Sequence, residues 1–310
     1  AMEKFGCDKP DLRNPLQLVE LSDIFKNEEF KVFSEPANDK NSRIAALIVP
    51  EGEKIGRGQI DRYTDFVKEF GAKGLAYIKV DGESIADLSS PILKYLSEEC
   101  LKNILTALKV KKGDLIFFGA GKEKIVNDYM SRLIAKIGMD LNLLKDGFEA
   151  CWITDFPMFE ETSDGSLTSL HHPFTCPVET ELEKLGKLSP LEINSKAYDM
   201  VINGVEIGGG SIRIHKKALQ EKVFELLGLS EDEAQKKFGF FLKTLTTGCP
   251  PHGGIAFGLD RLAMLMVGAE SIRDVIAFPK TQSALCLLTE APGSVTDESL
   301  DELHISRKED

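Results

Sequence analysis

Two carboxylates flank a predicted turn in the second half of the 310-residue sequence. Asn203-Gly204 separates two apolar stretches, and this dipeptide tolerates the positive φ angles of a type I′ hairpin turn. A regular two-residue hairpin pairs Met200 with Ile207 and makes Asp199 and Glu206 diagonal neighbours on one face. Carboxylates this close need a cation or a proton, and their hard oxygen atoms suit Mg²⁺ together with substrate phosphates. The pair predicts either a nucleotide–metal site or an ordinary solvated strand face.

The residues after the hairpin favour the first of these interpretations. Three consecutive glycines, Gly208–Gly210, contribute no side-chain packing, so they indicate a bulge or a ligand pressed against the backbone. Arg213 is seven residues beyond Glu206. A regular strand places the two on opposite faces, whereas a bulge in the glycine run brings both into one pocket. The planar guanidinium of Arg213 matches a carboxylate or a phosphate, which makes it a candidate for recognising an anionic substrate; a rim salt bridge is the alternative.

A second group of candidate residues is the segment Gly258-Leu259-Asp260-Arg261. We expect Asp260 to cap the amphipathic helix that follows and Arg261 to lie in its first turn. The N–H groups at a helix N-terminus, together with a neighbouring arginine, bind anions, and a triphosphate is the best candidate. The alternative is a capped core helix that carries a surface arginine.

Two further motifs carry weaker signals. His171-His172 with Cys176 supplies metal-ligand types, but no second cluster completes a four-ligand zinc site, so a polar substrate contact or a packed loop is preferred. Gly119-Ala120-Gly121-Lys122 follows a predicted strand. However, Ile116 stands where a phosphate-binding loop needs glycine, and Glu123 where it needs serine or threonine. We therefore expect an ordinary strand–helix turn there.

Composition describes a folded protein with an acidic surface. The hydrophobic fraction is 42% and the charged fraction 28%, and 38 basic against 50 acidic residues leave a net charge of −12. Such a surface disfavours nonspecific binding to nucleic acid or anionic lipid. No apolar run approaches the roughly 20 residues that span a bilayer. The six cysteines form no Cys-x-x-Cys pair, which indicates thiols in a reducing cytosol, and the opening Ala1-Met2 is typical of a cleavage scar.

The elements that must position the candidate residues fall into two regions. The first has an α+β or α/β pattern, with strands expected over residues 42–49, 74–80 and 114–118 and helices over 59–70, 91–109 and 123–143. We place a domain boundary near residue 144. The second region contains a strand over 151–157, the hairpin, helices over 217–227 and 232–244, a strand over 253–259 and an amphipathic segment over 260–267.

Five longer motifs make the chain resemble a known family over essentially its whole length. They are GCDKPDLR at 6–13, GAKGLAYIK at 71–79, LHHPFT at 170–175, GGGSIRIH at 208–215 and RDVIAFPK at 273–280. Together they resemble the C-terminal part of bacterial-type aspartyl-tRNA synthetases, which are class II aminoacyl-tRNA synthetases. The resemblance implies an α+β fold in which part of the antiparallel class II catalytic sheet carries an inserted α/β domain of bacterial type.

The same resemblance implies a domain organisation and an activity. Residues 1–16 and 145–310 would belong to the catalytic domain, and residues 17–144 to a GAD-like insertion domain. The implied enzyme is a ligase that uses ATP and Mg²⁺ to activate L-aspartate as aspartyl-adenylate. It then transfers the aspartyl group to aspartate tRNA, with asparagine tRNA left open as a second acceptor. The implied parent enzyme is a cytoplasmic homodimer.

The resemblance also implies roles for particular residues. Asp199 and Glu206 would hold Mg²⁺–ATP, Arg213 would pair with the side-chain carboxylate of the aspartate substrate, and His171 would close over the amino acid. Gly258-Leu259-Asp260-Arg261 matches the third class II motif, in which Arg261 would bind the terminal phosphate of ATP. The first two of these assignments agree with the chemistry expected from the residue types alone.

The chain departs from the family pattern at its start. The anticodon-binding domain, the first motif with its dimer contacts and the second motif with its α-phosphate arginine would all lie upstream of residue 1. We therefore expect this segment to be inactive by itself. The rival hypothesis is a non-catalytic RNA- or protein-binding module derived from a class II synthetase. A synthetase for asparagine or lysine is disfavoured by the bacterial-type insertion and by Arg213.

Overall fold

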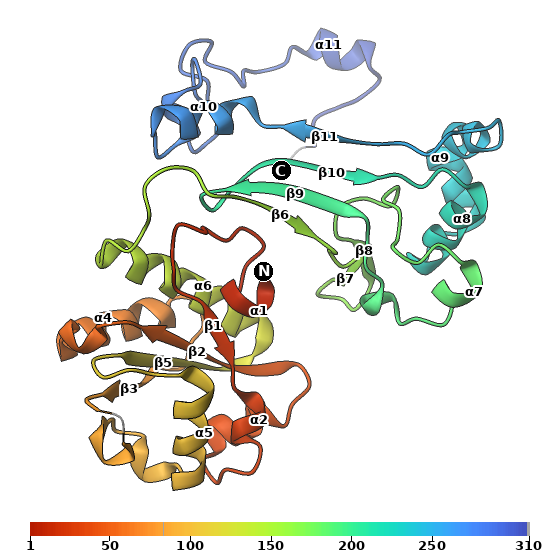
Figure 1. Ribbon diagram of the computed structural model, residues 1–310. Coiled ribbons are helices and arrows are strands. Elements are labelled where there is room, and N and C mark those ends of the chain that lie inside the picture. Colours follow the sequence, from red (N-terminus) through yellow and green to blue (C-terminus); the bar gives the residue numbers. More distant parts are fainter. Residues whose placement is uncertain (83, 309–310) are drawn as a thin grey trace. The chain divides into compact units, whose positions relative to one another are not determined.

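The computed structural model describes residues 1–82 and 84–308 of the chain. Its contacts divide into two compact units, residues 1–256 and residues 257–310, which are described separately below. The fold is mixed α+β with antiparallel sheets, as predicted (Figure 1). Within the described residues, none of the helices has the length and apolar character needed to cross a membrane.

A five-stranded sheet organises the first half of the large unit. The strand order is β1-β2-β5-β3-β4, and each neighbouring pair is antiparallel. The strands are β1 Leu18–Glu20, β2 Ser42–Val49, β3 Ala76–Val80, β4 Leu88–Ser89 and β5 Leu115–Lys122. The helices are α2 Ser22–Phe25, α3 Lys31–Ala37, α4 Arg57–Lys68, α5 Glu98–Leu108 and α6 Glu123–Asp140.

Both faces of this sheet are covered by helices, which explains why its central strands are mostly apolar. Along β2, Ala45, Leu47 and Val49 point into a core shared with α4 and α6. Ile44 and Ala46 point into a second core on the other face, shared with α2, α3 and α5. Because successive side chains point to opposite faces of a strand, residues 44–49, which meet the two cores, are all apolar.

Two predicted elements of this region are corrected. The helix expected over 91–109 is instead a 3₁₀ turn, η3 Leu93–Tyr95, followed by α5, because the Ser97 side chain accepts a hydrogen bond from the backbone N–H of Cys100 and starts a new helix there. The strand–helix turn expected over 119–122 does not exist. Strand β5 continues to Lys122, which pairs with Ser42 of β2, and α6 follows directly.

A four-stranded sheet organises the second half of the large unit. Its order is β11-β10-β9-β6, with β9 antiparallel to both β6 and β10. The strands are β6 Ala150–Thr154, β9 Ala197–Ile202, β10 Val205–Ile212 and β11 Gly253–Phe257, and a small sheet pairs β7 Phe159–Glu161 with β8 Leu167–Ser169. The helices are α7 Leu182–Leu185, α8 Lys217–Leu226 and α9 Glu231–Leu245.

The predicted hairpin is confirmed, but its register beyond the first two pairs is not as expected. Asn203 and Gly204 have φ angles of 51° and 79°, as a type I′ turn requires, and Glu206 pairs with Val201, as in a regular two-residue hairpin. The strand pairing then shifts between Glu206 and Gly208. Met200 therefore faces Gly208 rather than Ile207, because the β-bulge begins one residue before the glycine run.

The N-terminal segment is anchored by one buried arginine. Arg43 on β2 is only 5% exposed. Its guanidinium donates to the carbonyl oxygens of Met2 and Glu3, at 3.1 and 3.0 Å, and to the Asn127 side chain of α6 at 2.6 Å. These bonds fix helix α1, Met2–Phe5, and hence the direction in which the chain leaves it.

The second unit contains α10 Leu259–Val267, a 3₁₀ turn η5 Ile272–Asp274 and α11 Asp297–Glu302. The prediction that Asp260 caps α10 is wrong. Gly258 is the N-cap residue, and Asp260 lies inside the first turn, one residue before Arg261. Gly258 takes the cap position with an extended backbone. The negative charge of Asp260, in the first turn, interacts favourably with the positive N-terminal end of the helix dipole.

Candidate functional site

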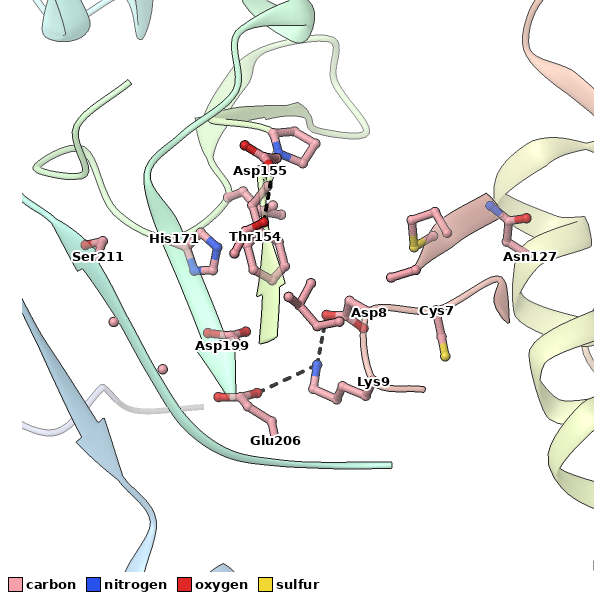
Figure 2. Close-up of a pocket in the computed structure, with 18 of the residues that line it drawn as sticks. Cys7, Asp8, Lys9, Asn127, Thr154, Asp155, His171, Asp199, Glu206 and Ser211 are labelled. Carbon is pink, nitrogen blue, oxygen red and sulfur yellow. Dashed lines mark hydrogen bonds and ion pairs between the residues drawn. The ribbon is translucent and has the colours of Figure 1, made fainter. Parts of the chain in front are cut away.

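A cavity of about 1100 Å³ in the large unit collects most of the candidate residues. Figure 2 shows the side chains that line it. They come from the N-terminal segment, helix α6, the end of β6 and the loop after it, the loop after β8, the hairpin β9–β10 and β11. The predicted site residues among them are His171, Asp199, Glu206 and Arg213. Glu206 and Arg213 line one pocket, which is the consequence expected of a bulge between them, although the bulge lies at Ile207 and not in the glycine run.

The two hairpin carboxylates converge over Gly209. Asp199 lies opposite Gly209 in the register of β9 and β10. A Cβ atom at Gly209 would lie 2.5 Å from Asp199 Oδ1 and 3.5 Å from Glu206 Oε1. Only a residue without a side chain leaves room for both carboxylates at this point. Burial raises the pKa of Asp199, and the negative charge of Glu206 raises it further, so the site favours a neighbouring cation.

A lysine that the residue-type analysis did not single out reaches this pair. Lys9 Nζ lies 2.9 Å from Asp8 Oδ2 and 3.7 Å from Glu206 Oε2. Figure 2 shows the ammonium group between the carboxylates of Asp8 and Glu206. Burial acts to lower the pKa of Lys9. The hydrogen bond to Asp8 and the charges of Asp8, Glu206 and Asp199 outweigh that effect, and its pKa is raised. Its presence in the motif GCDKPDLR was the only signal in the sequence.

The guanidinium of Arg213 is held by a histidine that was also missed. Arg213 Nη1 donates to His172 Nδ1 at 3.1 Å, and the backbone N–H of Phe174 donates to the same nitrogen at 3.2 Å. Since Nδ1 accepts twice, His172 is neutral with its proton on Nε2. Burial lowers the pKa of His172, and the charges of Arg213 and His171 lower it further, in agreement with this tautomer. His172 was predicted only as half of a histidine pair.

The other histidine of the pair, His171, lines the same cavity. The ring of His171 packs edge-on against Phe156 with the centroids 4.8 Å apart, and it lines the same cavity as Asp199. Cys176, weighed as a metal ligand with the histidines, is buried, and its thiol donates to the carbonyl oxygen of Pro177. Across residues 1–82 and 84–308, no group of three or more His, Cys, Asp or Glu side chains is arranged to hold a metal ion.

The remaining predicted residues, Gly258-Leu259-Asp260-Arg261, form the start of α10 in the second unit. Arg261 lies in the first turn of the helix, as predicted. Locally this is the arrangement in which backbone N–H groups and a cationic side chain meet at a helix N-terminus.

The family of the chain follows from its match to a described protein family. Residues 1–282 match the family described as tRNA synthetases class II (D, K and N), and the chain belongs to this family. The letters stand for aspartate, lysine and asparagine, so the match confirms the predicted class without deciding between the three amino acids. Class II tRNA synthetases are ligases that use ATP, an amino acid and tRNA.

Solved structures with a similar fold include synthetases for two amino acids. The aspartyl-tRNA synthetase of Entamoeba histolytica is 24% identical, with a TM-score of 0.33, over 50% of this chain and 26% of that one. The asparaginyl-tRNA synthetase of the same organism, in complex with asparaginyl-adenylate, is 16% identical, with a TM-score of 0.35, over 81% and 51%. The asparaginyl-tRNA synthetase of Pyrococcus horikoshii is 19% identical, with a TM-score of 0.29, over 43% and 27%. The chain thus spans between about a quarter and a half of the length of these proteins.

Proposed function

We propose that this chain is the part of an aspartyl-tRNA synthetase that binds aspartate and ATP. The observation that carries the proposal is Arg213, which lines the same cavity as Asp199 and Glu206 and whose guanidinium is held by the neutral ring of His172. A fixed cationic fork in a pocket suits a substrate with a side-chain carboxylate. Asparagine presents an amide, which leaves the charge of Arg213 without a partner.

Asp199 and Glu206 are proposed to hold Mg²⁺ together with the phosphates of ATP. Their oxygen atoms fit this role, because both approach one point above Gly209 and because Asp199 is in an environment that favours a cation. Bound Mg²⁺ would neutralise the phosphate charge. His171, which borders the same cavity, is proposed to close over the amino acid, and Gly258-Leu259-Asp260-Arg261 to bind ATP, with Arg261 at its terminal phosphate.

The proposed reaction needs no covalent participation by the protein. An α-carboxylate oxygen of aspartate attacks the α-phosphorus of ATP, a bond from oxygen to phosphorus forms, and the bond to the leaving pyrophosphate breaks. The aspartyl group of the adenylate is then transferred to the 3′ end of tRNA. The chain contributes by positioning the two substrates and by placing cationic groups where negative charge develops.

The proposal extends to the whole protein. Residues 1–16 and 145–310 would form part of a catalytic domain and residues 17–144 an inserted domain, in a cytoplasmic, dimeric enzyme that charges aspartate tRNA, with asparagine tRNA left open as a second acceptor. We propose that the 310-residue chain does not form the adenylate without further class II motifs. Formation of aspartyl-adenylate by the purified chain, supplied with aspartate and Mg²⁺–ATP, would contradict this part.

The substrate assignment is tested by replacing Arg213 in the full-length enzyme. We expect Arg213→Leu to abolish aspartate-dependent ATP–pyrophosphate exchange, because the substrate carboxylate loses its counter-charge. Arg57→Leu removes the same charge from an exposed position at the start of α4 and should leave exchange unchanged. Exchange that persists with aspartate in Arg213→Leu, or a wild-type enzyme that activates asparagine instead of aspartate, would refute the assignment.

A further inference from the structure

Lys9 joins the two parts of the cavity that are most distant in sequence. It lies in the N-terminal segment, which the buried Arg43 anchors to the five-stranded sheet, while Glu206 lies on the hairpin of the four-stranded sheet. The hairpin turn packs against this segment: a Cβ atom at Gly204 would lie 3.4 Å from the Cβ of Asp11 and 3.8 Å from the carbonyl oxygen of Lys9. The position of the lysine backbone is therefore set from both sides.

The side chain of Lys9 lies among three carboxylates. Its ammonium contacts Asp8 at 2.9 Å and Glu206 at 3.7 Å, and Asp199 shares the point above Gly209 with Glu206. Three negative groups in one corner repel one another unless a cation lies between them. Lys9 supplies that cation from within the chain. Both contacts are partly exposed, and the contact with Glu206 is the longer of the two, so it has the weaker Coulomb attraction.

We propose that Lys9 is an internal counter-cation of the Asp199–Glu206 pair, and that a divalent cation must displace its ammonium from Glu206 in order to bind there. This inference rests on the proposed role of the two carboxylates as metal ligands. The displaced ammonium keeps its shorter contact with Asp8, because the flexible four-carbon stem can swing without moving the backbone. Binding of the divalent cation therefore breaks only the long ion pair between Lys9 and Glu206, and Asp8 still compensates the charge of Lys9.

The inference predicts that removing the lysine charge strengthens binding of a divalent cation. The probe is Mn²⁺ alone, and free Mn²⁺ is measured by electron paramagnetic resonance in a titration of the purified chain. We expect Lys9→Met to bind Mn²⁺ about three- to fivefold more tightly than the wild type, the gain that corresponds to one partly exposed ion pair. Lys9→Arg, which keeps the charge, should bind within about twofold of the wild type.

Two controls test whether a change in Mn²⁺ binding is specific to Lys9. Lys73→Met removes the same charge from an exposed position in the five-stranded-sheet region, and it should leave Mn²⁺ binding unchanged if the effect of Lys9 is local. Unchanged far-ultraviolet circular dichroism shows that each variant is folded. Equal or weaker Mn²⁺ binding by Lys9→Met would overturn the inference, as would an equal gain in Lys73→Met.

Glu206→Gln separates this inference from the proposed function. If Glu206→Gln loses Mn²⁺ binding while Lys9→Met binds like the wild type, the carboxylates are metal ligands but Lys9 does not compete with the metal, and only the inference fails. If Glu206→Gln binds Mn²⁺ like the wild type, or if no variant binds it, the proposed metal role of the pair fails and the inference fails with it.

Discussion

The glycine run of β10 leads to a quantitative prediction about the four-stranded sheet. A Cβ atom at Gly210 would lie 2.0 Å from the carbonyl oxygen of Gly254 on the neighbouring strand β11 and 2.8 Å from Cε2 of Tyr198. Ordinary contacts of a Cβ atom begin near 3.4 Å, so Gly210→Ala must push the β11 backbone away by about 1.4 Å. At this position the group pressed against the glycine is the next strand, whereas the sequence also allowed a ligand.

The cost of this displacement has two parts. Overpacking against backbone costs about 1–3 kcal/mol. The Gly254 carbonyl also accepts a hydrogen bond from the Tyr198 hydroxyl at 3.0 Å, and losing that bond adds about 1 kcal/mol. We therefore expect Gly210→Ala to lower the free energy of unfolding by about 2–4 kcal/mol, which corresponds to a fall of roughly 5–12 °C in Tm for a unit of this size.

Gly254→Ala is the matched control. It introduces the same methyl group on the adjacent strand, where a Cβ atom would meet nothing within 4 Å. We expect the Tm of Gly254→Ala to stay within about 2–3 °C of the wild type. The only remaining effect is that alanine slightly reduces the conformational entropy of the unfolded chain. Thermal unfolding followed by circular dichroism measures both variants. Equal Tm values for Gly210→Ala and Gly254→Ala would refute the close-approach argument.

Three further predictions concern other parts of the molecule. In the proposed aspartyl-tRNA synthetase, His172→Leu should raise KM for aspartate about tenfold, because it removes a hydrogen bond to the charged Arg213. His172→Asn restores an acceptor and should recover most of this loss, whereas an unchanged KM in His172→Leu would contradict the positioning role. Arg43→Met should lower the free energy of unfolding by about 2–4 kcal/mol in urea titrations, because the oxygen atoms that accept hydrogen bonds from Arg43 lose their donor. A decrease in this free energy that is smaller than the error of the titration would contradict the prediction. Iodoacetamide at pH 7.5 should modify Cys286 first, since hydrogen bonds from Thr289 lower its pKa and increase its thiolate fraction. It should modify Cys100 last, since burial raises the pKa of Cys100 to about 12. Peptide mass spectrometry that finds the reverse order would contradict this prediction.

The sequence by itself determined the local features of this protein. Asn203-Gly204 specified the hairpin, because its turn requires two positive φ angles, and the hairpin placed Asp199 and Glu206 on one face. The apolar run over residues 44–49 specified a strand, which is present as part of β2. Each of these features depends on neighbours in the chain, and the residue types alone were sufficient to predict it.

Only the tertiary structure decided how the site is completed. The sequence predicted a bulge in the glycine run, but its position at Ile207 was decided by the pairing with the partner strand. Lys9 reaches Glu206 only because the N-terminal segment is anchored next to the hairpin, and His172 holds Arg213 across 41 positions in the chain. Neither pairing leaves a periodic signal in the sequence, since both are contacts between side chains that the fold alone brings within hydrogen-bond or ion-pair distance.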